Sequence, residues 1–297
     1  MGSQFWWIYD AAAAAVVLVC IFVMGKKGTL RSMIALVCAG VALAAAYGAS
    51  GAISNFIYDN NIRSSTIKKI EKNLEKDTFN EKLAEYIESL GYGVDVKATK
   101  LGETFFKDGD IDDLIYKYVN NINGKKAADE AEFKEQLHEG YAKVIKDIAS
   151  KELASYAASD AARMVLEDSS SIKEFGQLAQ DELDRKPAAE LFADEFTAPA
   201  YRKVIRYVSF IALFVIIAVL AFLLIRAFTG SDGYVGAVSH IMGGIFGIVF
   251  AAAIIFVIAV MIRLYVLMGS NEMMIFNKDT IDSTYVFKYF YDLVLKM

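Results

Sequence analysis

The stretch SHIMGGIFGIVFAAAIIFVIAVMI, residues 239–262, decides the fold of this 297-residue chain. As a helix with a rise of about 1.5 Å per residue it is roughly 36 Å long, which exceeds the ~30 Å hydrocarbon layer of a membrane. Small residues recur at every fourth position, on one helix face, and allow a second helix to approach closely. They are Ser239, Gly243, Gly247 and Ala251. The stretch therefore predicts a membrane-spanning helix packed through a seam of small residues.

Three further apolar stretches have the length of membrane spans, so we expect four transmembrane helices. The predicted spans are residues 5–24, 32–58, 203–227 and 239–265. They form two hairpins, residues 1–58 and residues 199–268. The second span carries a seam of its own, and we expect Gly40 and Gly48, like Gly243 and Gly247, to be helix-packing residues.

The polar part of the chain, residues 59–198, is expected to be an acidic, helical, soluble domain inserted between spans two and three. From Asp59 to Ala200 the chain has 30 acidic and 20 basic residues, whereas the remainder has 6 and 11. This acidic balance argues against a nucleic-acid partner, which requires a basic surface. Apolar residues recur at helical spacing, most regularly from Phe133 to Leu153. The predicted fold class is therefore an all-α, polytopic membrane protein with a helical soluble insert.

Two local patterns refine the boundaries of this polar part. Ser171 and Glu174 form a capping-box pattern that predicts the start of a helix, and this helix should include Leu183 and end at Pro187. Residues 269–297 are expected to form an amphipathic tail, either on the membrane surface or against the helical bundle.

The first connection, Gly25–Arg31, carries three basic residues, which favours a cytoplasmic location for it. With four spans, both termini and the soluble insert would then lie outside the cytoplasm. The bases of the third span and of the tail count against this orientation, but bases that flank the first hairpin usually have more influence.

No stretch of the sequence forms a complete catalytic, cofactor-binding or metal-binding motif. Gly48-Ala49-Ser50-Gly51 resembles the motif of rhomboid proteases, with His240 as a candidate base, but these residues are predicted at opposite ends of their spans. Asp108, Asp110 and Asp112 resemble the start of a calcium loop that lacks its glycine and its final glutamate. A helix N-cap is the favoured interpretation of these aspartates.

Two ionisable residues fall near the same membrane face, Asp10 in the first span and Arg263 at the end of the fourth. Charges at such positions are costly unless they are paired. We therefore consider an Asp10–Arg263 ion pair, with exposure of Arg263 to the membrane surface as the alternative.

The two hairpins resemble the colicin V production protein (CvpA) family. The resemblance rests on Trp7-Ile8-Tyr9-Asp10, on Lys27-Gly28-Thr29-Leu30-Arg31, on Val238–Gly247 and on Asp282-Ser283-Thr284-Tyr285. The chain departs from the family in having Ser239-His240 where an acidic or amide residue and an arginine are usual. It also has about 140 residues between spans two and three, where the family has a short link.

The resemblance implies a bacterial inner-membrane protein associated with bacteriocin export, a toxin-biosynthesis function, or with envelope homeostasis. We expect a non-enzymatic accessory or scaffold factor without a cofactor, whose insert is an interaction or sensing domain. The expected partners are the lipid bilayer, further copies of the chain, and envelope or export proteins. An oligomeric channel or transporter is the alternative; its polar path would need more polar residues than the spans provide.

Overall fold

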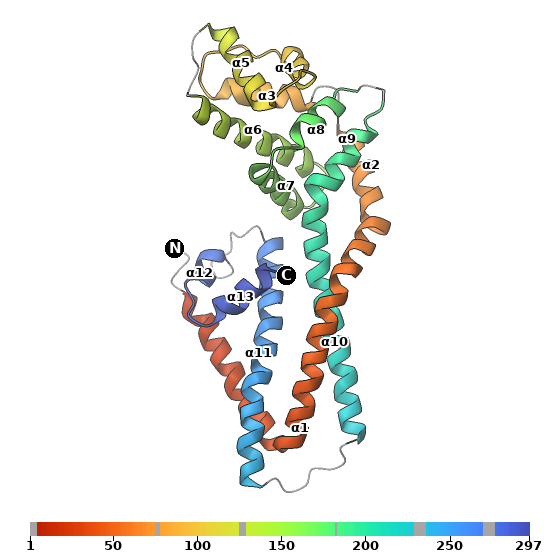
Figure 1. Cartoon of the computed structure of the whole chain (residues 1–297), viewed down its shortest axis with the longest axis vertical. Coiled ribbons are helices and arrows are strands. Elements are labelled where there is room, and N and C mark those ends of the chain that lie inside the picture. The colour runs from red at the N-terminus through yellow and green to blue at the C-terminus, as the bar shows by residue number, and fades with distance from the viewer. Residues whose placement is uncertain (1–4, 75–77, 125–128, 182, 229–235, 270–276) are drawn as a thin grey trace. The chain divides into compact units, whose positions relative to one another are not determined.

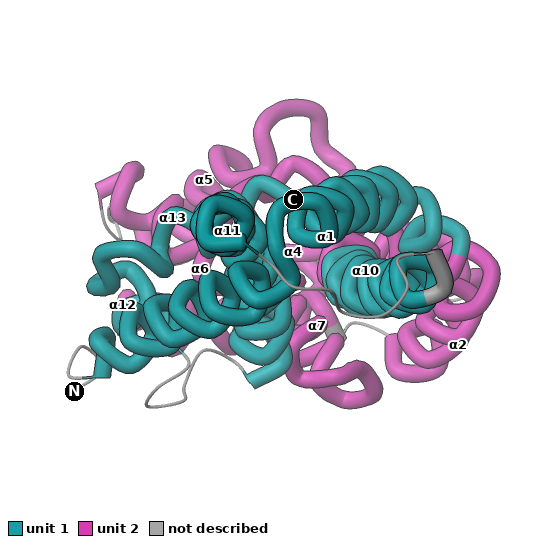
Figure 2. Tube along the Cα trace, turned by 90° about the horizontal axis from the view of Figure 1, so that it is seen from below, with its two compact units in different colours: residues 1–56, 202–297 teal, residues 57–201 magenta. Residues whose placement is uncertain are grey.

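The computed structural model describes residues 5–74, 78–124, 129–181, 183–228, 236–269 and 277–297, and over these residues the only regular secondary structure is helical. The chain divides into two compact units (Figure 2). Unit 1 consists of residues 1–56 and 202–297, and unit 2 consists of residues 57–201. Each unit has a hydrophobic core of its own.

Unit 1 contains the most apolar helices of the chain. Its elements are α1 (Trp6–Ile57), most of α10 (Ala198–Phe228), α11 (Ala237–Met268), α12 (Lys278–Asp282) and α13 (Phe287–Leu295). Three helical stretches in the described residues are long and apolar enough to cross a membrane, namely Trp6–Asn73, Lys186–Arg226 and Ala237–Met268. These helices identify the chain as a membrane protein.

The first two predicted spans form one helical stretch that changes direction at Gly28. Gly28 has φ 75° and ψ 176°, a backbone conformation that only glycine adopts readily. Figure 1 shows α1 turning sharply there, so that its two limbs run in opposite directions. The sequence predicts separate spans at residues 5–24 and 32–58, whereas the helical geometry continues on both sides of a single non-helical residue.

The C-terminal tail packs against the helical bundle of unit 1. Phe287, Tyr291 and Val294 of α13 are buried in the same core as Tyr207 of α10 and Ile255 of α11. The packing against the bundle that we expected as one alternative for the tail is therefore present in the structure. Residues 270–276 of the predicted tail lie outside the described residues.

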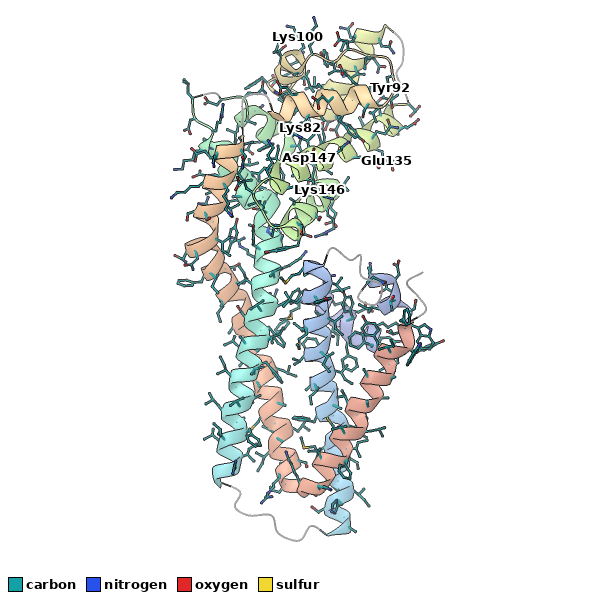
Figure 3. The ribbon with its side chains drawn as sticks, turned by 180° about the vertical axis from the view of Figure 1, so that it is seen from behind. Lys82, Tyr92, Lys100, Glu135, Lys146 and Asp147 are labelled. Carbon is teal, nitrogen blue, oxygen red and sulfur yellow. The ribbon has the colours of Figure 1, made fainter. Side chains whose placement is uncertain are left out.

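Unit 2 is a bundle of shorter helices with two π-helical segments. Its elements are η2 (Tyr58–Ile62), α2 (Arg63–Asn73), α3 (Thr78–Ser89), α4 (Ala98–Phe105), α5 (Ile111–Asn123), α6 (Glu130–Ser150), α7 (Ser155–Glu167), α8 (Ile172–Leu178), α9 (Lys186–Leu191) and η3 (Phe192–Thr197). The apolar face predicted along residues 133–153 is confirmed, because its members are buried in the core of the unit. An ion pair between Lys82 and Asp147, at 3.0 Å, joins α3 to α6 on the surface (Figure 3).

The first and last segments of unit 2 are fastened to each other. The Tyr58 hydroxyl donates to the carbonyl of Ala193 at 2.7 Å. Arg63 donates to both carboxylate oxygens of Asp194, each at 2.7 Å, a bidentate geometry that adds direction to the ion pair. The rings of Tyr58 and Tyr201 stack with centroids 6.1 Å apart. The chain therefore enters and leaves this unit at adjacent points.

The prediction for the helix after Ser171 is partly wrong. Helix α8 starts at Ile172, but Ser171 makes no capping hydrogen bond through its side chain, and the helix ends at Leu178. Leu183 is almost fully exposed. Pro187 lies in the first turn of α9, where its missing N–H costs no helical hydrogen bond, so it starts a helix instead of ending one.

Candidate functional site at the bend of α1

Helices α1 and α11 touch backbone to backbone through the seam that begins at residue 239. A Cβ atom added to Gly243 would lie 2.5 Å from the carbonyl oxygen of Met24, and one added to Gly247 would lie 2.6 Å from that of Cys20. Only a residue without a side chain permits this approach. Gly243 and Gly247 are therefore placed as helix-packing residues.

The second predicted seam has a different environment. A Cβ atom added to Gly40 or to Gly48 would meet nothing within 4 Å. These two glycines do not pack the helices of unit 1 against one another.

The bend of α1 is held by three hydroxyl side chains. Beyond Gly28, the N–H of Thr29 donates to the Oγ of Ser239 at 2.8 Å, and the two hydroxyls lie 3.1 Å apart. The Ser32 hydroxyl donates to the carbonyl of Met24 across the bend at 2.7 Å. Two backbone groups next to the bend, the N–H of Thr29 and the carbonyl of Met24, thereby have hydrogen-bond partners.

A cavity of about 460 Å³ lies beside this bend, within unit 1. Its lining includes Lys27, Arg31 and Arg226, and the remaining lining is mostly apolar. The apolar lining comes from three helices and consists of Met24, Ala35, Cys38, Ala39, Phe214, Ala218, Ala221, Phe222, Ile225 and Phe250. The lining of the cavity is therefore mostly apolar and contains three basic side chains.

Asp10 binds the start of α13. Its carboxylate accepts hydrogen bonds from the backbone N–H groups of Tyr285, Val286 and Phe287, at 2.7, 3.0 and 3.0 Å. The first N–H groups of a helix have no partner within the helix and carry partial positive charge, so a carboxylate is favoured there. Asp10 acts as a distant cap for α13.

Arg263 contacts the same helix from α11, and the structure gives it a partner other than Asp10. Its guanidinium donates to the hydroxyl of Tyr291 at 3.2 Å and lies 5.9 Å from the centre of that ring. The salt bridges among the described residues do not include an Asp10–Arg263 pair. The Asp10 carboxylate accepts from backbone amides, and the Arg263 guanidinium donates to a tyrosine hydroxyl. Both residues therefore bind α13, and they do not form an ion pair with each other.

The protease interpretation of Ser50 receives no support from the geometry. The Ser50 side chain is buried, and its hydroxyl donates to the carbonyl of Tyr47 in its own helix at 3.0 Å. His240 is exposed beside the bend of α1, where its carbonyl lies next to Gly25. Ser50 lies 22 residues beyond that bend on the second limb of α1, a helical rise of roughly 33 Å, far beyond hydrogen-bond reach.

The aspartate-rich loop of unit 2 is a helix start. Asp110 is the N-cap of α5 and accepts from the backbone N–H groups of Asp112 and Asp113, each at 3.1 Å. In the described residues, no group of three or more metal-binding side chains is placed to hold an ion. The N-cap interpretation of this loop is confirmed.

Asp112 also takes part in a cluster that sequence reasoning missed. Its carboxylate lies 2.6 Å from Nε2 of His138 and accepts from the Tyr141 hydroxyl at 3.0 Å. Ser169 Oγ lies 3.4 Å from the same nitrogen of His138. A serine–histidine–aspartate relay uses the two different ring nitrogens, so this arrangement fixes α5 against α6 and does not activate the serine.

The cavity was missed as well, although its signal is in the sequence. Arg31, Ala35 and Ala39 are spaced by four residues and share a helix face, as do Phe214, Ala218 and Phe222. Small side chains on the same helix face as a basic residue leave space beside the charged group, and this pattern can be found in the sequence. Which helices face each other, however, is not encoded in either stretch alone.

Comparison with protein-family models, with curated proteins and with solved structures finds no match to this chain.

Proposed function

We propose that the chain is a four-span, non-enzymatic membrane protein that acts as a scaffold or accessory factor, as the resemblance to the CvpA family implies. In this proposal each limb of α1 crosses the membrane once, and α10 and α11 provide the other two crossings. Unit 2 is an interaction or sensing domain for envelope or export proteins. The membrane is the bacterial inner membrane.

One observation carries the proposal. The two segments on which the resemblance mainly rests, Lys27–Arg31 and Val238–Gly247, are 210 residues apart between Thr29 and Ser239, yet these two residues form hydrogen bonds. Gly243 and Gly247 complete the joint on the backbone of the first limb. Segments that resemble one family and also contact each other support a shared architecture for the membrane unit.

A second observation supports the separate role of unit 2. It has its own core, and its charged groups pair on the surface, for example Lys134 with Glu130 at 2.8 Å. An acidic unit with a core of its own suits a domain that meets partners in water. The proposal places this unit outside the cytoplasm, since Lys26, Lys27 and Arg31 favour the cytoplasm for the bend.

Cysteine labelling in intact cells tests the four crossings and their orientation. Cys20 and Cys38 are replaced by alanine, and single cysteines are placed at two exposed positions, Lys26 at the bend and Ser150 in unit 2. We expect an impermeant maleimide to label Ser150→Cys in intact cells and Lys26→Cys only after permeabilisation. The reverse pattern would make unit 2 cytoplasmic. Labelling of both in intact cells would contradict the crossing by each limb of α1.

Complementation tests the functional assignment. A bacterial strain without its own CvpA-type protein should regain colicin V export or envelope integrity when it produces this chain. Gly247→Leu, which blocks the joint between α1 and α11, should fail to restore the phenotype. An unchanged phenotype with a correctly inserted wild-type chain would refute the assignment.

A further inference from the structure

Helix α13 carries a second apolar face in addition to the one that is buried in the core of unit 1. With 3.6 residues per turn, Val286, Tyr289 and Leu293 fall on one stripe of this helix. Val286, at the N-cap, is 50% exposed, Tyr289 is 64% exposed and Leu293 is 55% exposed. The stripe is therefore an apolar surface that the described residues of the chain leave uncovered.

The polar residues of α13 occupy a third face. Lys288, Asp292 and Lys296 recur at every fourth position, so they share one side of the helix. Asp292 and Lys296 are exposed, and Lys288 is partly exposed. The buried face, the apolar stripe and the polar face thus divide the circumference of the helix into three sectors. A helix with these sectors suits a position beside a bundle at the boundary between an apolar and an aqueous phase.

The residues that bind α13 fix its distance from the bend of α1. Asp10 binds the start of α13 and Arg263 binds its middle, and Figure 1 shows α13 at the start of α1 and beside the last turns of α11. From Asp10 to Gly28 the first limb of α1 rises roughly 27 Å, at about 1.5 Å per residue. From Ser239, which is bonded to Thr29 at the bend, α11 rises roughly 36 Å to Arg263.

Both distances are close to the ~30 Å thickness of the hydrocarbon layer of a membrane. The bend carries basic residues, which are costly inside this layer, so the bend lies at one of its faces. Helix α13 therefore lies at the level of the opposite face.

Aromatic residues around the start of α13 mark the same level. Trp7, at the start of α1, is 55% exposed, and the rings of Trp6 and Tyr285 lie edge to face with centroids 5.1 Å apart. Tryptophan and tyrosine gather at the level of the lipid headgroups, because their rings are apolar and their N–H and O–H groups are polar. The apolar stripe of α13 thus continues the exposed surface of a membrane helix.

We propose that α13 is an interfacial helix whose apolar stripe, Val286, Tyr289 and Leu293, is buried in the lipid at the membrane surface opposite the bend. The partner is the lipid bilayer, at the boundary of its hydrocarbon layer, and the polar face with Lys288 and Asp292 is in contact with water. The inference rests on the crossing of the membrane by the first limb of α1, which is part of the proposed function. It is independent of the partners proposed for unit 2.

Spin-label accessibility of the full-length chain in liposomes of dioleoylphosphatidylcholine tests this position. Cys20 and Cys38 are replaced by alanine, and a nitroxide is attached to one introduced cysteine. Oxygen concentrates in hydrocarbon and a neutral nickel chelate concentrates in water, so their effects on the relaxation of the label distinguish the two phases. We expect the label at Leu293→Cys to be more accessible to oxygen than to the chelate. The label at the adjacent Asp292→Cys, on the polar face, should show the reverse.

Two reference labels separate this inference from the proposed crossings. Val19→Cys, on the exposed face of α1, should report hydrocarbon, and Ser150→Cys, on α6 of unit 2, should report water. If Val19→Cys reports hydrocarbon and Leu293→Cys reports water, the interfacial position of α13 is refuted while the crossing by α1 stands. If Val19→Cys also reports water, both are refuted. Inaccessibility of Leu293→Cys to both reagents would mean that a protein surface, such as a second copy of the chain, covers the stripe, and would overturn the proposal.

Hydrogen exchange in the same liposomes measures what the lipid contact contributes. Leu293→Glu should accelerate exchange in α13 by about tenfold, because the variant loses the contact of one leucine with hydrocarbon. Asp292→Asn, on the polar face, should leave this exchange unchanged, and exchange in α6 of unit 2 should be unchanged in both variants. Equal exchange of α13 in the two variants would contradict a lipid contact at Leu293.

Discussion

Individual glycines of this chain have opposite environments although their sequence patterns look alike. Gly243 and Gly247 contact the backbone of α1, whereas Gly40 and Gly48 have free space where a side chain would project. A four-residue spacing of small residues therefore identifies a helix face that permits close packing, but it does not say which face is used.

This contrast yields a matched pair of variants. Gly247→Leu should destabilise unit 1, since overpacking a tight contact typically costs about 1–3 kcal/mol and here the obstacle is rigid backbone. Gly48→Leu should leave folding unchanged, and its elution volume in detergent reports whether that face contacts another copy of the chain. Thermal melting and size-exclusion chromatography provide the measurement. Equal melting temperatures for the two variants would contradict the assigned packing.

Asp10 is the residue whose role differs most from its predicted one. Asp10→Ala leaves three backbone N–H groups at the start of α13 without their acceptor, and we expect a loss of roughly 1–3 kcal/mol in the stability of the docked tail. Hydrogen exchange of residues 285–295 should accelerate, while exchange in α6 of unit 2 should stay as in the wild type. Unchanged protection of α13 would mean that the apolar contacts of Phe287, Tyr291 and Val294 hold it alone.

At the scale of elements, helical periodicity and apolar length were sufficient to predict the helices but not their partners. The face of α6 follows from the spacing of Phe133, Leu137 and Tyr141, and it is buried as predicted. The Asp10–Arg263 pair did not follow, because their proximity depends on how α13 docks. The docking of α13 brings Asp10 into contact with residues 285–287, more than 270 positions away. A local sequence pattern cannot predict a contact of this kind.

The free energy of unfolding of unit 2 should decrease in alkaline solution. Burial raises the pKa of Tyr156 to about 12. Burial, and to a smaller extent the negative charge of the nearby Asp112, raises the pKa of Tyr141 well above its usual value of 10.0. Between pH 10 and 12 the unfolded chain loses these protons and the folded unit keeps them, so stability is complete below pH 10 and declines as the pH rises.

Urea unfolding followed by circular dichroism measures this effect. We expect a lower midpoint at pH 11 than at pH 9 and a smaller decrease in the Tyr156→Phe variant, which has no phenol to ionise. Identical decreases in the wild type and in this variant would exclude Tyr156 as a contributor.

At the scale of the whole molecule, the distribution of charge along the chain follows the division into two units. Residues 59–200 carry the excess of acidic residues and form most of unit 2, whereas the membrane helices lie on either side in the sequence. Composition was therefore sufficient to indicate two parts. The cavity of unit 1 could not be predicted in this way, because its lining comes from α1, α10 and α11, which are far apart in the sequence.

The fastening of the two ends of unit 2 predicts that this unit can be removed. Because the rings of Tyr58 and Tyr201 stack, a Gly/Ser linker of about six residues, which reaches roughly 20 Å when extended, can replace residues 59–200. The shortened chain should insert in membranes and elute as a single symmetric peak in size-exclusion chromatography in detergent. Aggregation of the shortened chain would show that unit 1 needs unit 2 to fold.

Because its two ends are joined, unit 2 can be gained or exchanged as one segment during evolution. The contacts Arg63–Asp194 and Tyr58–Ala193 hold the two ends of the segment together. The segment can therefore be inserted into a loop of another protein without moving the two ends of that loop apart. Acquisition or exchange of such a segment would leave the lipid-facing helices of the recipient unstrained. A membrane protein could in this way change what it meets in water through a single insertion event.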